Sequence, residues 1–438
     1  MNTQTIEAGS SFRSSIARAS KVSLSSVCLL IFCAAFLSYA YTTRGVLDWM
    51  GIPAGAETLN VARTLATTGR FADPFGSIQA HSGFTAHLAP VYPAILAVLF
   101  RGVGYGLASL TILWTANLVF IAVQLALLPV LSSLLDLGVL PGVIGALLGI
   151  LLPQYTVDFV WESLLTGAEL VLLCLLIRQI PNVRNNWLRV SLTGLLAGVA
   201  ILTNPVTVVV LAAWALAASF SLQPGERREA IGSFAIIIGI AALVCVPWII
   251  RNKVRLGSFF LIRDNVGLEL SVSNNNCAAA TLRENLESGC QAIVHPSRNS
   301  EITQQIATMG EYKFNQMQLR QALGWIAQHL KRFALLTAQR FALFWFPVKG
   351  LAPFRRFPAA VWATTLISFL GFVFLWKRKR EVAWFLGGTL LVYPPIYYLV
   401  QFEPRYRDPI MWISLLLAGY GLTELLKRTA FFRGLQNP

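Results

Sequence analysis

Charged residues are scarce in this chain. Only 13% of its 438 residues are Asp, Glu, Lys or Arg, whereas 55% are hydrophobic, and the mean hydropathy is +0.61. A soluble domain carries roughly 25% charged residues, because its surface has to be solvated. The composition therefore excludes an ordinary soluble globular protein of this length.

Sequence motifs for nucleotide chemistry are also missing. The chain contains no Walker loop, no dinucleotide-binding glycine pattern and no metalloprotease helix. The net charge of +15 does not indicate a nucleic-acid partner, because Lys and Arg form no contiguous basic helix and no groove with aromatic residues. Internal repeats and weakly symmetric halves of the transporter kind are absent too.

The apolar residues occur in long blocks separated by short polar breaks. Blocks of this length cross a hydrocarbon core of about 30 Å as helices, since no other open structure satisfies its backbone hydrogen bonds there. We therefore predict an all-α polytopic membrane protein with about ten transmembrane helices, interfacial helices and a large periplasmic loop. The predicted spans are 22–42, 107–131, 139–157, 164–180, 187–203, 205–220, 230–250, 357–376, 382–401 and 409–426.

The first block follows a polar segment that bears Arg13, Arg18 and Lys21. Residues 38–40, Ser-Tyr-Ala, have the small-x-small pattern of a signal-peptide cleavage site. The apolar region of a signal peptide usually has about 7–15 residues, and this block is longer. We predict an uncleaved first helix, with a signal peptide as the alternative.

The positions of the basic residues predict the topology. The apolar stretch Leu88–Phe100 is short and opens with Pro90 and Pro93, so we expect it to enter only the outer leaflet. The basic clusters between the spans then lie on the same side as the N-terminus, as the positive-inside rule requires. These clusters are Arg178/Arg184/Arg189, Arg227/Arg228, Lys377–Arg380 and Lys427/Arg428/Arg433.

This threading divides the chain into a membrane module and a tail. Residues 1–426 form a single module, and 427–438 form a basic cytoplasmic tail. The outward segments are 43–106, 158–162, 251–356 and 402–408. Arg251, Lys253 and Arg255 directly follow a predicted helix on the outward side, so either the charge bias fails there or these cations have a function.

The cysteines fall into two groups. Four of the six lie within apolar blocks and are expected to be small buried hydrophobes. Cys277 and Cys290 both lie in the long outward segment, where the compartment permits oxidation. We predict a disulfide between them, with two free thiols as the alternative. Their spacing, with no nearby Cys-His pair, does not resemble a zinc site.

The outward segments contain acidic residues and a histidine at notable positions. Glu57 opens an apolar periodicity that stops at Gly69, which predicts an amphipathic helix. His87 stands just before a proline-rich break. Asp158 and Glu162 are four residues apart, so on one helix turn they would face the same way. The alternatives are a favourable helix-dipole contact for Glu57 and a simple interfacial helix end for the other two.

Together these patterns resemble integral-membrane glycosyltransferases of the C superfamily (GT-C). Residues 57–93 resemble their first periplasmic loop, and 152–163 resemble the short second one. The patterns are most similar to those of the bacterial lipopolysaccharide-core, aminoarabinose and protein-mannosyl transferases. These enzymes usually carry Asp where this chain has Glu57, and many have two consecutive prolines where it has Ala89-Pro90. The large outward loop adds matches at 247–252, 257–259, 263–265, 267–270, His295-Pro296, Gly310-Glu311, Trp325-Ile326 and Arg340-Phe341.

The resemblance implies an enzyme of the bacterial inner membrane with its active face in the periplasm. It would transfer a sugar, with inversion, from a polyprenyl-phosphate donor to a lipid, glycan or protein acceptor. The donor, the acceptor and membrane lipids are the expected partners, and a divalent metal ion is a possible cofactor.

Such chemistry needs a carboxylate to take the acceptor's proton and cations to stabilise the departing phosphate. Glu57 is the first choice for the base, with Asp158 or Glu162 supporting it. A metal would use Asp158, Glu162 and His87, and His87 is also a candidate for substrate binding. The arginines expected to bind the donor phosphate, with lipid-headgroup anchoring as the alternative role, are Arg251, Arg255, Arg263, Arg405 and Arg407.

A lipid or glycan translocase or an ion-coupled transporter is the competing functional class. A transporter places acidic or polar groups within its helices near the bilayer midplane. In this chain the candidate acids gather at one face instead, which favours the enzyme. A glycan polymerase or ligase, which would share substrates with the enzyme, and a non-catalytic scaffold are the remaining alternatives.

Overall fold

The structure, a computed structural model, describes residues 23–45, 56–76, 81–158, 160–179, 187–221, 224–348 and 358–428, without the side chains of 219–230. In these ranges the chain is helical, and its extended pairing is limited to two isolated bridges, Ala72 with Phe84 and Thr281 with Phe402. The all-α prediction is confirmed. The basic N-terminal segment and residues 429–438 of the predicted tail lie outside the described residues.

Each predicted span corresponds to helical structure. Among the described residues, six stretches are long and apolar enough to cross a membrane: Leu24–Thr43, Leu107–Leu134, Ile231–Leu256, Pro358–Arg378, Arg380–Leu399 and Pro404–Arg428. The polytopic architecture is confirmed, while the number of ten crossing helices stays a prediction. The helices are α2 (Leu24–Thr43), α6 (Leu107–Ala126), α7 (Leu128–Leu134), α8 (Val139–Leu151), α9 (Ser163–Arg178), α10 (Trp187–Thr203), α11 (Thr207–Ser221), α12 (Pro224–Leu256), α19 (Pro358–Arg378), α20 (Arg380–Val392), α21 (Pro395–Leu399), η1 (Pro404–Ile410) and α22 (Met411–Arg428).

Two predicted helix ends are wrong. The prediction 139–157 is too long, because α8 ends at Leu151 and Pro153, which has no N–H to donate, follows at once. The prediction 230–250 is too short, because α12 continues to Leu256. Arg251, Lys253 and Arg255 therefore lie on the last turns of α12 rather than beyond it. Cations are favoured there by the partial negative charge of a helix C-terminus.

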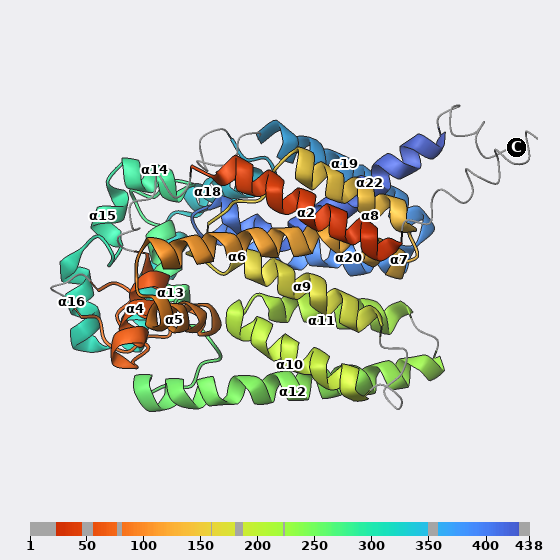
Figure 1. Ribbon diagram of the computed structural model, residues 1–438. Coiled ribbons are helices and arrows are strands. Elements are labelled where there is room, and N and C mark those ends of the chain that lie inside the picture. Colours follow the sequence, from red (N-terminus) through yellow and green to blue (C-terminus); the bar gives the residue numbers. More distant parts are fainter. Residues whose placement is uncertain are drawn as a thin grey trace, which may run out of the picture.

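The segments predicted to lie outward form short helices at one end of the bundle, which we call the outward end. Figure 1 shows α4, α5, α13, α14, α15 and α16 gathered there, while the last turns of α22 lie at the opposite end. The short helix α5 packs beside α4 at this end. The bounds are α4 (Glu57–Thr68), α5 (Val91–Val103), α13 (Val266–Ser273), α14 (Leu282–Glu287), α15 (Cys290–Val294), α16 (Ser300–Met309), α17 (Glu311–Gln328) and α18 (Leu330–Trp345).

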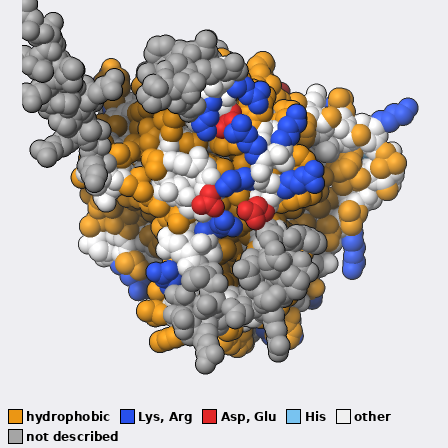
Figure 2. Space-filling view, turned by 90° about the vertical axis from the view of Figure 1, so that its right-hand side faces the viewer, with side chains coloured by type: hydrophobic (Ala, Val, Ile, Leu, Met, Phe, Trp, Pro, Cys, Tyr) orange, Lys and Arg blue, Asp and Glu red, His pale blue; other side chains and the backbone are white. Residues whose placement is uncertain are grey.

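The opposite end gathers basic side chains. Lys379 lies 3.8 Å from Asp136, and Arg378 and Lys427 both contact Glu424, at 2.5 and 2.9 Å. Figure 2 views the molecule from this end, where Lys and Arg outnumber Asp and Glu. These contacts place basic residues from the break between α19 and α20 and from the end of the last span on one face, as the predicted topology requires.

Close backbone packing holds the centre of the bundle together. A Cβ added to Gly419 of α22 would lie 2.0 Å from the carbonyl oxygen of Pro141 in α8, and one added to Gly371 of α19 would lie 2.0 Å from that of Leu417 in α22. Small residues let membrane helices approach this closely. Helix α22 is thereby fixed between α8 and α19, and it fixes η1, which directly precedes it.

Candidate active site

A cavity of about 600 Å³ lies at the outward end of the molecule. It is formed by the first residues of α4, the turn before α9, the loop from α12 to α13, the segment around α15, and α21 with η1. One part of the wall is apolar, with Leu261, Val266, Leu282 and Ile396 among its residues. The charged residues of the wall are Glu57, Glu162, Glu269, Glu403, Arg263, Arg298 and Arg405.

Glu57 reaches this cavity because the sequence starts a helix at that residue. The amphipathic helix is confirmed: α4 runs from Glu57 to Thr68, buries Leu59 and Ala62 against α5, and ends at Gly69 with φ +73°. The Glu57 side chain is 13% exposed. Burial raises the pKa of its carboxyl to about 7. A carboxyl that titrates near neutral pH suits a general base.

Asp158 and Glu162 do not share a helix turn, so that part of the prediction is wrong. Asp158 lies in the loop after α8, and Glu162 is the residue that caps the start of α9. Each faces a different arginine: Asp158 Oδ2 is 3.9 Å from Arg405 Nε, and Glu162 Oε1 is 3.9 Å from Arg263 Nη1. Glu162 lines the cavity, whereas Asp158 does not. Burial raises the pKa of Asp158 to about 6, although Arg405 acts against this shift.

Arg263 and Arg405 are the predicted phosphate ligands that line the cavity. Arg263 donates from Nε to the His87 carbonyl oxygen at 2.8 Å. The Arg405 guanidinium lies over the Trp161 ring, 3.8 Å from its centroid, and donates to Glu403 Oε2 at 3.1 Å. Both cations are held in place by protein contacts before any substrate binds.

The other three predicted arginines lie elsewhere. Arg251 donates to the carbonyl oxygens of Phe71 and Thr85, at 2.7 Å each, and so holds the first outward segment against α12. Arg255 lies over the Phe84 ring. Arg407 is fully buried and donates to the Trp345 carbonyl oxygen at 3.0 Å and to Thr365 Oγ1 at 2.8 Å. None of the three lines the cavity, and their contacts are those of structural residues.

His87 lines the cavity and faces a carboxylate that the sequence analysis did not select. Its Nε2 is 3.9 Å from Glu269 Oε1, and its ring lies edge-on to Phe75. Burial, with a further contribution from Arg263, lowers the pKa of His87 well below its ordinary value. Arg263 and Asp264 hold this segment in place through the carbonyl oxygens of His87 and Ala86.

The residues proposed for a metal do not fit one. Within the described part of the chain, no three His, Cys, Asp or Glu side chains form a group that could hold a metal ion. Asp158 and Glu162 each face an arginine instead, at 3.9 Å. His87 faces Glu269 rather than either of them.

His295, Glu269 and Glu403 belong to the site, although the sequence analysis did not select them. Glu57 Oε1 is 3.8 Å from His295 Nε2, and Glu269 and Glu403 both raise the pKa of Glu57. Glu269 and His295 stood in stretches that resembled the large GT-C loop, and Glu403 preceded the Arg-Tyr-Arg run. Only the tertiary structure shows that these segments converge on Glu57.

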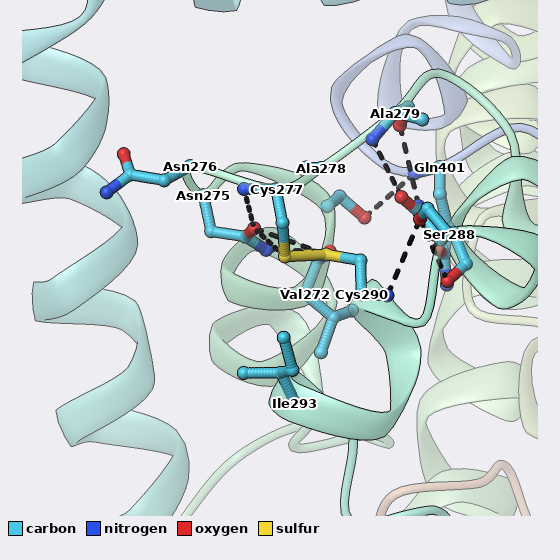
Figure 3. The surroundings of a disulfide bond; sticks show 12 residues. Val272, Asn275, Asn276, Cys277, Ala278, Ala279, Ser288, Cys290, Ile293 and Gln401 are labelled. Atoms are coloured by element: carbon cyan, nitrogen blue, oxygen red, sulfur yellow. Dashed lines mark hydrogen bonds between the residues drawn. A yellow bond between two sulfur atoms is a disulfide. The ribbon is translucent and has the colours of Figure 1, made fainter.

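A disulfide braces the loop that supplies His295. Cys277 and Cys290 are bonded, with their Cα atoms 5.6 Å apart. Figure 3 shows Asn275 beside the bond, where its Oδ1 accepts from the Cys277 N–H at 3.0 Å. The same loop is tied to the segment before η1, since Gln401 accepts from Asn285 at 2.9 Å and Phe402 N–H donates to the Ala280 carbonyl oxygen at 2.8 Å.

No protein-family model matches the chain, and no curated protein matches it by sequence. Solved structures do match in three dimensions. The Archaeoglobus fulgidus oligosaccharyltransferase AglB, in complex with an inhibitory peptide and a dolichol-phosphate, is 14% identical with a TM-score of 0.57. The match covers 94% of this chain and 51% of AglB.

The same enzyme gives similar matches in other states. Its apo form is 12% identical with a TM-score of 0.59, over 95% of this chain and 52% of the enzyme. A form with Zn and sulfate is 12% identical with a TM-score of 0.54, over 92% of this chain and 50% of the enzyme. The chain thus spans about half the length of these oligosaccharyltransferase chains. Over most of its own length, the chain shares the fold of this part of the oligosaccharyltransferase.

Proposed function

We propose that this chain transfers a sugar from a polyprenyl-phosphate donor to an acceptor at the periplasmic face of a bacterial inner membrane. One observation carries the proposal: the buried carboxyl of Glu57 shares a cavity with Arg263 and Arg405 at the outward end of a glycosyltransferase fold. A buried carboxylate and two pre-positioned guanidinium groups are the parts that sugar transfer from a lipid phosphate requires.

The reaction follows from these positions. The Glu57 carboxylate takes the proton of the acceptor nucleophile, which then bonds to the anomeric carbon of the sugar. The bond from this carbon to the phosphate oxygen breaks, and its electron pair leaves with the phosphate. Attack opposite the leaving group inverts the anomeric carbon.

The departing phosphate is stabilised by arginine. Arg263 and Arg405 line the same cavity as Glu57 and are only 22% and 11% exposed. Guanidinium groups bind phosphate through paired hydrogen bonds, which are strong where water is excluded. The apolar wall around Leu261, Val266 and Ile396 suits the first isoprene units of a lipid tail. Neighbouring fold members support this donor class, because AglB was solved with a dolichol-phosphate.

A carrier function has one observation in its favour. Glu169 lies within α9, is 5% exposed, and accepts from Thr203 Oγ1 of α10 at 2.8 Å. The sequence analysis did not select this intramembrane carboxylate. Its hydrogen bond joins two packed helices, which accounts for it as a structural contact. The acids that face a cavity, by contrast, lie at the outward end.

The test uses purified protein in vesicles with a panel of undecaprenyl-phosphate monosaccharides labelled in the sugar. We expect at least one donor to lose its sugar while undecaprenyl phosphate accumulates. A translocase would move intact donor between leaflets without breaking the sugar–phosphate bond. Movement of intact donor with no cleavage of any panel member would contradict the proposal.

A further inference from the structure

The segment after α15 brings a histidine to the proposed base. His295 is 6% exposed and lines the cavity, and its Nε2 is 3.8 Å from Glu57 Oε1. Some 240 residues separate the two in the sequence, so the contact exists only because the outward loop folds over α4. The sequence analysis assigned no role to this histidine.

The hydrogen bonds of His295 fix its tautomer. Its Nδ1 lies 3.2 Å from the backbone N–H of Ser297 and 2.7 Å from Ser297 Oγ. A backbone N–H can only donate, so Nδ1 must accept, and the proton of the neutral ring is then on Nε2. This N–H faces the Glu57 carboxylate.

The ring is also neutral and fixed in place. Burial, with a further contribution from Arg298, lowers the pKa of His295 to about 4. Phe75 lies edge-on to the ring, with the centroids 5.9 Å apart. The segment that follows is pinned by Thr303 Oγ1, which donates to the Pro296 carbonyl oxygen at 2.7 Å. At neutral pH His295 is therefore a fixed uncharged donor.

An uncharged donor suits this position. The other charged groups of the cavity that act on Glu57 are Glu269 of α13, Arg405 of η1 and Glu403 before η1. A second cation there would stabilise the carboxylate and weaken it as a base, whereas an N–H dipole orients it at little cost in basicity. We propose that His295 is a positioning residue for Glu57: its Nε2–H, 3.8 Å from Oε1 and so beyond hydrogen-bond distance in this structure, orients the carboxylate to take the acceptor's proton. This inference rests on the proposed function.

The first test needs no turnover. The chain has four histidines, so protein labelled with ¹⁵N-histidine gives few signals, and His295→Gln assigns the relevant one. We expect His295 to be neutral with its proton on Nε2 at pH 7, and Glu57→Gln to shift the Nε2 signal. A charged ring, a proton on Nδ1, or an Nε2 chemical shift that stays unchanged in Glu57→Gln would overturn the proposal.

The second test uses whichever undecaprenyl-phosphate sugar is turned over. His295→Leu should lower kcat about 10- to 100-fold with little change in KM, since a misplaced catalytic group has effects of this size. The acidic limb of its pH–rate profile should move to higher pH, because losing a donor raises the pKa of a carboxyl. His295→Gln, whose amide N–H can replace Nε2–H, should recover most of the rate. His329→Leu, at an exposed histidine stacked on Trp325, is the matched control.

A double-mutant cycle separates the two proposals. In a Glu57→Gln background, His295→Leu should cost less than about twofold more, because the two residues act together. If Glu57→Gln is inactive but His295→Leu alone keeps the wild-type rate and pH profile, the positioning role is refuted and the proposed function stands. If Glu57→Gln keeps the wild-type rate, Glu57 is not the base, and the positioning role of His295 is refuted as well.

Discussion

The two ends of the bundle both contain arginine, but they use it differently. At the outward end, Arg263 and Arg405 are 22% and 11% exposed, line a cavity, and each lies against a carboxylate. At the opposite end, Arg378 is 55% exposed and Lys427 is 45% exposed, and both contact Glu424, whose side chain is buried. Exposed cations set the orientation of a membrane protein, whereas buried cations beside a cavity perform binding or catalysis.

The largest expected effect at the outward end comes from Glu57→Gln, which keeps the size of the side chain and removes the base. Turnover should fall about 10²–10⁴-fold, while binding of undecaprenyl phosphate stays nearly unchanged. Initial rates of sugar release, with Glu169→Gln as the matched control, measure this loss. A variant that keeps more than about a third of the wild-type rate would move the base to another carboxylate.

The wild-type pH profile tests the same residue. Burial raises the pKa of Glu57 to about 7, and the base works only when ionised. The rate should therefore fall about tenfold per pH unit below this value, because each unit removes most of the remaining carboxylate. A rate that is independent of pH between about 5 and 8 would contradict this assignment.

Arg405→Ala tests the buried cations and should have the next largest effect. A hydrogen bond to a charged group contributes about 1.5–3 kcal/mol, which corresponds to roughly 10- to 100-fold weaker binding of undecaprenyl phosphate. The matched variant at the opposite end, Arg378→Ala, should bind this lipid as the wild type does. Equal losses from both variants would mean that the arginines act only by attracting anionic lipid.

Removal of the disulfide should lower stability moderately. Replacing Cys277 and Cys290 by Ala should reduce the free energy of unfolding by up to about 3 kcal/mol, since the bridge closes a short loop. Thermal unfolding in detergent measures this, with the Cys174→Ala variant as the comparison. Intact mass under non-reducing conditions should show two hydrogens fewer than the free-thiol form, and free thiols at both positions would refute the bridge.

Chelation should have the smallest effect. Since Asp158 and Glu162 each face an arginine, we expect EDTA to change the rate of sugar release by less than about twofold. Loss of activity that Zn²⁺ or Mn²⁺ restores would show that the carboxylates leave the arginines and bind a metal during turnover.

The sequence predicted the ends of helices correctly where a single residue type, such as Gly or Pro, determines the end. The start of α4 at Glu57, its end at Gly69, and the break between the predicted spans 187–203 and 205–220 all follow from local residue preferences. The end of α8 was missed because the residues after Pro153, Gln-Tyr-Thr-Val, carry no charge, and the lack of charge alone does not register a helix stop.

The site was predicted less completely than the fold. The candidate residues Glu57, Glu162, His87, Arg263 and Arg405 do line one cavity. Arg251 and Arg407 had the same residue type and a similar position in the sequence, but their guanidinium groups bind backbone carbonyl oxygens. Which arginine turns toward the cavity depends on tertiary packing, and no periodicity in the sequence encodes it. The contact between His295 and Glu57 escaped prediction for the same reason.

The most direct test of the whole account is whether the two ends lie on opposite sides of the membrane. Single cysteines replace Lys313, exposed on α17, and Arg380, exposed at the start of α20, in protein whose four unpaired cysteines are changed to Ser. In intact cells with a permeable outer membrane, a maleimide that cannot cross the inner membrane should label position 313 and spare position 380. Labelling of position 380 from the periplasm, or of position 313 only after the inner membrane is opened, would contradict the account.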